Sequence, residues 1–365
     1  MRVSLLAPLV APLGAAQLGG AQAVVCDLGL GLTRAGADAL VVGAPGSRLP
    51  GLRLWRAPGG PYPAEALRFG PPGEQPEIGA TASMSQLAGW LGVAGMLRER
   101  GGVVHGHAMD WPAFVSTANL GLPVVHTFHL APGGAAAAAA AALATSVRPR
   151  PWFVAPSRSL AAAWTAHVGV DAVIPNGVDP DAVPFRERPE PGLAIVAGRI
   201  SPEKGTHLAV AAARRAGLRV LVAGGVYDPA YHREKVLPLL DGEQVRQLGP
   251  LPRTRLLRLL GRGSVLVMAS LWEEPFGMLA VEAAMAGTPV ACTRRGALAE
   301  IVNAQMGRLA DRATVAALAT TIVEAARLDR GAVRAAAVRR FALAGVVARH
   351  LRLYRALSVH AWGSP

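Results

Sequence analysis

The 365-residue sequence is poor in lysine, and this shapes its charge. It contains only two lysines, Lys204 and Lys235, against 35 arginines, so the net charge of +13 is almost entirely an arginine effect. The arginines form no basic run, which disfavours a nucleic-acid-binding protein. Two explanations for their excess stay open. One is a composition bias towards Arg and Ala, and the other is attraction to anionic lipid headgroups or an acidic substrate.

Cysteine is equally scarce. Cys26 and Cys292 are far apart and form no metal-binding pattern, so we expect a reduced, cytoplasmic protein. Peripheral contact with the inner face of the membrane is the variant that the arginine excess suggests. The uncharged segment from Val3 to Cys26 has the apolar character of a signal peptide, but Pro8 and Pro12 interrupt it. No other stretch looks long and apolar enough to span a bilayer.

Two common nucleotide-binding signatures are also missing. The sequence has no Gly-x-Gly-x-x-Gly and no Gly-x4-Gly-Lys-Ser/Thr, which disfavours dinucleotide oxidoreductases and P-loop NTPases. The octa-alanine run 135–142 predicts a helix or low-complexity filler without chemistry.

Short runs of Val, Leu and Ala alternate with longer segments rich in Ala, Leu and Arg, which predicts an α/β fold. The length suggests two domains. Three prolines and alternating charges between 184 and 192 predict a linker. The expected strands of the first half are 3–7, 39–42, 103–107, 123–126, 153–155 and 172–174. Those of the second half are 193–197, 220–223, 245–248, 264–268 and 289–291.

The most informative stretch runs from Glu274 to Glu282. The first carboxylate precedes a Phe276-Gly277 turn, and the second falls inside an apolar helix expected to end near Gly287. Such a turn aims helix N–H groups at a ligand that bears oxygens or negative charge. Glu282 could simply lie on a helix surface, but its apolar neighbours predict burial, and a buried carboxylate needs partners. Vicinal ribose hydroxyls would serve.

The second half opens with Gly-Arg-Ile-Ser-Pro-Glu-Lys-Gly at 198–205, directly after an apolar strand. Arg199 and Lys204 form a cation pair at the carboxyl end of that strand, where they can neutralise a diphosphate. The alternative is a solvated turn with a stray charge.

The first half offers less specific candidates. Gly19 and Gly20 lie between the first strand and its helix, where the backbone can approach a ligand closely, and the alternative is a tight turn. Four histidines follow strands, but their spacing matches no standard zinc pattern, and a histidine after a strand more often has a structural role. They are His105, His107, His126 and His129.

Together these motifs resemble the retaining nucleotide-sugar glycosyltransferases of family GT4. The resemblance covers about residues 3–357 and is densest from 176 to 300. It rests on the two glutamates separated by seven residues, the 198–205 text, Pro-Asn-Gly-Val-Asp at 175–179 and Pro-Val-Val-His-Thr-Phe-His at 123–129. It implies a GT-B fold, in which two Rossmann-like doubly wound domains face each other across a cleft.

The resemblance also implies domain roles. Residues 1–183 would bind the acceptor, 184–192 would be the linker and 193–340 would bind the donor. Residues 341–365 would cross back to the first domain, as part of a final helix over about 332–357.

Site roles follow from the same resemblance. His129, Glu274, Arg199 and Lys204 are expected at the reaction centre, and Glu282 is expected to hold the ribose. His105 or His107 would meet the acceptor. The expected donor-binding set is Gly19, Gly20, Arg199, Lys204, Glu274, Phe276, Gly277, Met278, Leu279 and Glu282.

The implied reaction moves a sugar from a nucleotide diphosphate-sugar to a hydroxyl of a glycan, lipid or small molecule, with retention and with neither metal nor cofactor. Three departures from the family pattern occur: Ala269-Ser270 for Pro-Ser, Gly296-Ala297 for Gly-Gly, and Gly-Ala-Asp-Ala-Leu at 36–40 for Gly-His-Glu-Val. The last makes the acceptor half divergent. A glycoside hydrolase and a non-catalytic nucleotide-sugar-binding protein stay open as alternatives, and a nucleotide-sugar epimerase is disfavoured.

Overall fold

The computed structural model describes residues 1–14, 20–58 and 80–362. The chain forms two compact units, described separately below. The first extends from Met1 to Gly177 and includes the C-terminal helix from Leu343, and the second extends from Val178 to Ala342. Each unit contains its own parallel sheet, covered by helices. The α/β class predicted from the sequence is therefore confirmed.

The first unit has a seven-stranded sheet in the order β3-β2-β1-β4-β5-β6-β7. Its strands are β1 (Arg2–Leu6), β2 (Asp38–Gly43), β3 (Arg53–Arg56), β4 (Val103–Gly106), β5 (Val124–Thr127), β6 (Trp152–Ala155) and β7 (Ala172–Val173). Its helices are α1 (Gly20–Arg34), α2 (Ala80–Arg100), α3 (Trp111–Ser116), α4 (Gly134–Ser146), α5 (Arg158–Trp164) and α13 (Leu343–Trp362).

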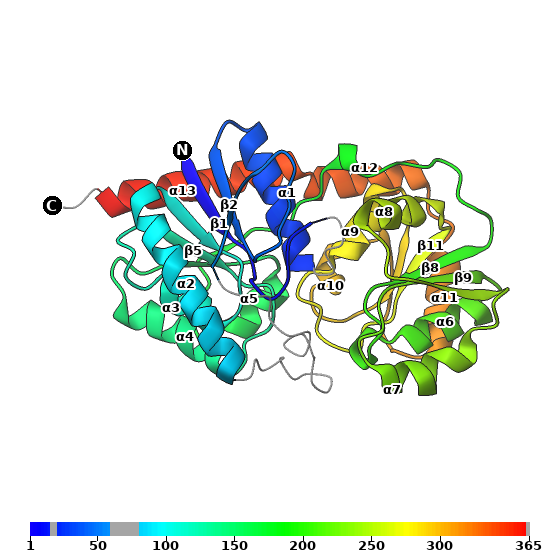
Figure 1. The fold of residues 1–365 in the computed structure, drawn as a ribbon. Coiled ribbons are helices and arrows are strands. Elements are labelled where there is room, and N and C mark those ends of the chain that lie inside the picture. Colours follow the sequence, from blue (N-terminus) through cyan, green and yellow to red (C-terminus); the bar gives the residue numbers. More distant parts are fainter. Residues whose placement is uncertain (15–19, 59–79, 363–365) are drawn as a thin grey trace. The chain divides into compact units, whose positions relative to one another are not determined.

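Successive side chains of these strands point to opposite faces of the sheet, and both faces are buried. In β1, Leu5 packs beneath α1 and α13, whereas Leu6 packs beneath α2. This explains why the strands read as continuous apolar runs, as is typical of parallel sheets. Figure 1 shows α1 and α13 on one side of this sheet and α2 on the other. The edge strand β3 is only half buried, and the sequence pattern missed it.

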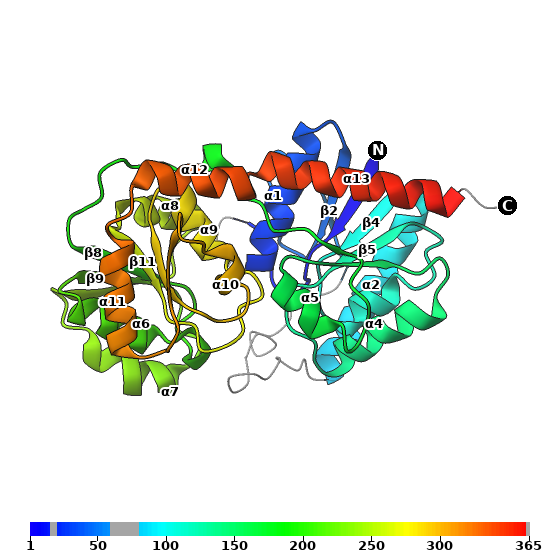
Figure 2. The same cartoon turned by 180° about the vertical axis from the view of Figure 1, so that it is seen from behind.

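The final helix of the prediction is two helices in the structure. The second unit ends with α12 (Arg330–Phe341), and α13 begins at Leu343. Ala342 between them is extended, with ψ of 130°, and it pairs with Val178 in an isolated parallel bridge. Neither glycine nor proline marks this break, so the local sequence gives no sign of it. Helix α13 packs on the first unit, as Figure 2 shows.

The second unit has a six-stranded sheet in the order β10-β9-β8-β11-β12-β13. Its strands are β8 (Leu193–Ala197), β9 (Arg219–Ala223), β10 (Val245–Gly249), β11 (Val265–Met268), β12 (Val290–Thr293) and β13 (Gly307–Ala310). Besides α12, its helices are α6 (Thr206–Arg215), α7 (Pro229–Tyr231), α8 (Arg253–Arg262), α9 (Met278–Met285), α10 (Leu298–Ile301) and α11 (Val315–Ala325).

Two apolar layers cover this second sheet. Helices α8, α9 and α12 pack on one face and α6 and α11 on the other, as Figure 1 shows. Strand β8 contributes Ile195 to the first layer and Ala194 and Val196 to the second. Strand β13 was not expected from the sequence.

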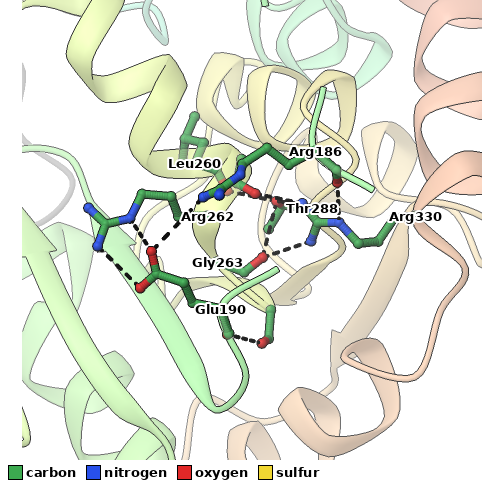
Figure 3. A network of polar contacts seen from close by, with 9 residues as sticks. Arg186, Glu190, Leu260, Arg262, Gly263, Thr288 and Arg330 are labelled. Carbon is green, nitrogen blue, oxygen red and sulfur yellow. Dashed lines mark hydrogen bonds and ion pairs between the residues drawn. The ribbon is translucent and has the colours of Figure 1, made fainter. Parts of the chain in front are cut away.

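The stretch expected to be a linker is tied into the second unit. Arg262 donates from Nε to Oε1 of Glu190 at 2.5 Å, and Arg330 donates from Nε to the carbonyl of Arg186 at 2.8 Å. Arg330 also donates to the carbonyls of Gly261 and Gly263 at 2.8 and 2.7 Å. Figure 3 shows this network. The structure divides the chain after Gly177, which lies before the expected linker 184–192. Among the described residues, no helix combines the length and apolarity that a membrane span requires.

Candidate functional site

The strand order of the second unit places two of the sequence motifs at one edge of the sheet. Strand β8 lies between β9 and β11, so the chain winds outwards from β8 in one direction and then returns to start the other half at β11. Ligands of doubly wound sheets bind at such a switch point, beyond the carboxyl ends of the strands. The loop after β8 carries Arg199 and Lys204, and the loop after β11 carries Glu274.

A close backbone contact joins these two loops. Gly205 has φ of +61°, and a Cβ atom there would lie 2.1 Å from the carbonyl oxygen of Ala269. Only glycine therefore fits between the short 3-10 turn Pro202–Lys204 and the end of β11. This contact places Lys204 beside the loop that carries Glu274.

Lys204 and Glu274 form a short ion pair, with 2.6 Å between Nζ and Oε1. The Ser270 hydroxyl donates to the same Oε1 at 2.7 Å, and the ammonium lies 4.6 Å from the ring centroid of Trp272. Glu274 is only 5% exposed. Its burial would raise the pKa of the carboxyl, but the attraction and hydrogen bond of Lys204 outweigh this and the pKa lies below its usual value. Glu274 is therefore ionised at neutral pH.

Arg199 lies in a similar polar cluster. Its Nη2 is 3.4 Å from Oε1 of Glu203, which also accepts from the Ser201 hydroxyl at 2.6 Å. The guanidinium lies over the ring of Tyr227, 5.6 Å from the centroid. Burial lowers the pKa of Arg199, and the Glu203 carboxylate opposes that effect. The loop after β8 thus places two cationic side chains, Arg199 and Lys204, at the carboxyl edge of the sheet, and an ion pair fixes the position of each.

Helix α9 begins directly after the Glu274 loop. Its N-cap is Gly277, with φ of +93°, and a Cβ there would lie 2.7 Å from Leu298. Because the cap residue is glycine, it has no side chain that could accept hydrogen bonds from the first N–H groups of the helix. These groups favour a negatively charged ligand. The Phe276 ring packs edge-to-face on Phe341 in the core, so Phe276 can meet a ligand only through its backbone.

Glu282 lies in the middle of α9 and is 6% exposed, which agrees with the burial predicted from its neighbours. The guanidinium of Arg253, the first residue of α8, donates to Oε1 of Glu282 from Nε at 3.1 Å and from Nη2 at 2.9 Å. The sequence analysis missed Arg253, because it is 29 residues from Glu282 and no local motif links them. The sequence analysis also missed the contacts of Ser270 with Glu274 and of Trp272 with Lys204.

The remaining predicted site residues belong to the first unit. Gly19 lies outside the described residues, and Gly20 is the exposed first residue of α1. His129 follows β5 and is 9% exposed, and its Nε2 is 2.9 Å from Nδ1 of His107. His105 bonds Tyr354 of α13 and Thr127. Across the described ranges, no three His, Cys, Asp or Glu side chains are arranged to hold a metal ion.

A cation-bearing carboxyl edge, followed by an uncapped helix N-terminus, is typical of Rossmann-like units that bind phosphorylated ligands. Two family models match adjoining parts of the chain. The Glycosyltransferase Family 4 model matches residues 18–182, and the model for glycosyl transferases group 1 matches residues 180–336. The chain belongs to the GT4-type glycosyltransferases.

The chain is similar to one curated relative and to two solved structures. The glycogen synthase of Mycobacterium tuberculosis is 32% identical over 246 residues, a match that covers 60% of this chain and 59% of the relative. A glycosyltransferase involved in avilamycin A biosynthesis has a structure with TM-score 0.72 and 26% identity, covering 100% of this chain and 98% of the other. Anabaena HepE, in complex with UDP and glucose, gives TM-score 0.75 at 18% identity, covering 98% and 100%. These solved structures confirm the predicted GT-B fold.

Proposed function

We propose that this chain is a retaining glycosyltransferase that transfers a hexosyl or related group from a nucleotide diphosphate-sugar to an acceptor hydroxyl, without a bound metal. One observation carries the proposal: Lys204 and Arg199 lie at the switch point of the second sheet, with Glu274 and the N-terminus of α9 beside them. Phosphates suit the cations and helix amides, and sugar hydroxyls suit the carboxylate.

In the proposed reaction the bond between the anomeric carbon and the donor phosphate oxygen breaks while the acceptor oxygen bonds to that carbon from the same face. The acceptor proton passes to the departing phosphate oxygen. Arg199, Lys204 and the first amides of α9 stabilise the charge that develops on the diphosphate. Such a mechanism requires no carboxylate nucleophile, and it agrees with Glu274 being engaged by Lys204.

The same geometry disfavours a glycoside hydrolase. A hydrolase needs a carboxylic acid with a raised pKa and a second carboxylate as base or nucleophile. The pKa of Glu274 lies below its usual value, and Glu282 is paired with Arg253. Neither group has the environment of a general acid.

Donor binding tests the proposal most directly. We would measure thermal shifts with UDP, GDP, ADP, TDP and their sugar conjugates on the wild-type protein and on Glu282→Ala. A ligand that binds only the folded state stabilises it by about 2.7 kcal/mol at a hundredfold excess over its dissociation constant. We expect one nucleotide family to raise the melting temperature of the wild type and not of the variant. No shift with any nucleotide would refute the proposal.

Turnover separates an enzyme from a binding protein. Donor consumption and product formation are measured with lipid-linked glycan, polysaccharide and small-molecule acceptors. We expect product with one of these acceptor classes. Donor affinity without product from any acceptor would instead support a non-catalytic nucleotide-sugar-binding protein. Salt-sensitive sedimentation with anionic liposomes would support a peripheral site at the cytoplasmic face of a membrane.

A further inference from the structure

Arg253 occupies a position that its own helix does not favour. It is the first residue of α8, and the first turn of that helix contains no acidic residue and no side-chain cap. A cation at a helix N-terminus opposes the helix dipole. The compensation comes from outside the helix, because Glu282 of α9 accepts both of the described Arg253 hydrogen bonds.

The contact between the two residues is well supported by packing. Leu257 and Leu260 of α8 lie in the same buried core as Ala283 and Ala284 of α9. The two helices therefore hold the guanidinium and the carboxylate at a fixed separation. The side chain of Arg253 is 22% exposed and that of Glu282 is 8% exposed, so the pair lies at the boundary between core and solvent. A ligand at the carboxyl edge of the sheet can reach such a pair, whereas a fully buried pair would only support the fold.

We propose that Arg253 is a positioning residue, which orients the Glu282 carboxylate so that it accepts hydrogen bonds from the vicinal hydroxyls of the donor ribose. Two donors that converge on Oε1 restrict the rotation of the carboxylate. A carboxylate held in one orientation by an ion pair is a strong acceptor for hydroxyl groups. The pair thereby selects a ribonucleotide over a deoxyribonucleotide. This inference rests on the proposed function.

The test compares nucleotides that differ by one hydroxyl. Dissociation constants of UDP, ADP and GDP and of their 2′-deoxy counterparts are measured by calorimetry on the wild-type chain. The wild type should bind the preferred ribonucleotide about tenfold or more tightly than its deoxy form, as expected for one hydrogen bond to a charged group. The Arg253→Gln variant should bind the ribonucleotide about tenfold less tightly, with little change for the deoxy form, so that the ratio between them falls towards one.

The ratio separates positioning from a structural role. A variant that only loosens the fold weakens both nucleotides equally and leaves their ratio unchanged, which would overturn the inference. Arg253→Lys should retain part of the discrimination, because a cation remains. Arg255→Gln removes a charge from the same helix turn at an exposed site and should keep the wild-type ratio.

A double variant protects the test against unfolding. Arg253→Gln together with Glu282→Gln leaves no unpaired carboxylate, and its ratio should equal that of Glu282→Gln alone. If the ratio of the double variant stayed at the wild-type value, the inference would be wrong while the proposed function stood. If the wild type bound no nucleotide at all, both would be wrong.

Discussion

Five buried histidines make the first unit sensitive to acid. They are His105, His107, His126, His129 and His350, and each is at most 9% exposed. Burial lowers the pKa of His126 and His350 to about 3 and that of His129 to about 4, and it lowers the pKa of the other two well below the usual value. All five are therefore neutral in the folded protein at pH 6, whereas an unfolded histidine titrates near 6.5.

The sign of the effect follows from proton linkage. Below pH 6.5 the unfolded chain binds more protons than the folded one, so stability falls as pH falls towards the folded pKa values near 3 to 4. Each histidine lowers the free energy of unfolding of the first unit by about 1.4 kcal/mol between pH 7.5 and 5.5, and the five together lower it by about 7 kcal/mol. Asp110 opposes this, because burial raises its pKa to about 6, and it returns about 1 kcal/mol over the same range. The net loss, about 6 kcal/mol, is comparable with the stability of a whole domain.

The assay is chemical unfolding of the full chain at pH 7.5, 6.5 and 5.5, followed by tryptophan fluorescence. Trp90 and Trp164 are fully buried in the first unit, whereas Trp272 is the only tryptophan in the sequence of the second. The transition of the first unit should move to lower denaturant as pH falls. A transition midpoint that stayed constant from pH 7.5 to 5.5 would refute the reasoning.

A single substitution sharpens this test. His350 packs against the ring of Tyr354, and its Nδ1 has no hydrogen-bond partner among the described residues. The His350→Phe variant should be at least as stable at pH 7.5, since it removes an unsatisfied polar atom, and its loss of stability between pH 7.5 and 5.5 should be smaller than that of the wild type by about 1.4 kcal/mol, one histidine's share. His167→Gln, at an exposed position, is the matched control.

Three further predictions concern the second unit. Arg330→Met should destabilise it by about 3 to 5 kcal/mol in urea unfolding, because several buried carbonyls lose their donor, and Arg330→Lys should recover little. Lys204→Met should cost about 3 kcal/mol by leaving the Glu274 carboxylate buried and unpaired, and adding Glu274→Gln should restore most of it in a double-mutant cycle. Lys204→Ala should weaken donor binding and slow turnover together, and unchanged kinetics would contradict the donor-site assignment.

The sequence predicted the central strands of both sheets because they are buried on both faces. Strands such as Leu193–Ala197 then appear as uninterrupted apolar runs, which need no tertiary information to recognise. Two of the edge strands, β3 and β13, lack this signal and were missed, whereas the edge strands β7 and β10 were predicted. Arg53–Arg56 at one edge is half exposed and contains two arginines, so its pattern resembles a loop.

Contacts between distant segments were beyond the reach of local patterns. The break at Ala342 depends on its pairing with Val178, and the Arg253–Glu282 pair depends on how α8 and α9 pack. Arg330 appeared in the sequence as one arginine among many, yet it joins the ends of two helices to the segment after Val183. An arginine-rich chain hides such residues, since composition alone does not distinguish a buried guanidinium from an exposed one.

Lysine, in contrast, is scarce in this chain, and its scarcity made Lys204 stand out in the sequence. Lys204 makes a 2.6 Å contact with Glu274 while it lies 4.6 Å from the ring of Trp272, and the backbone of Gly205 next to it is pressed against Ala269. A compact ammonium fits between a carboxylate and an indole in this confined loop, whereas a planar guanidinium needs room for its five donors. The contacts of this loop therefore favour lysine over arginine at position 204.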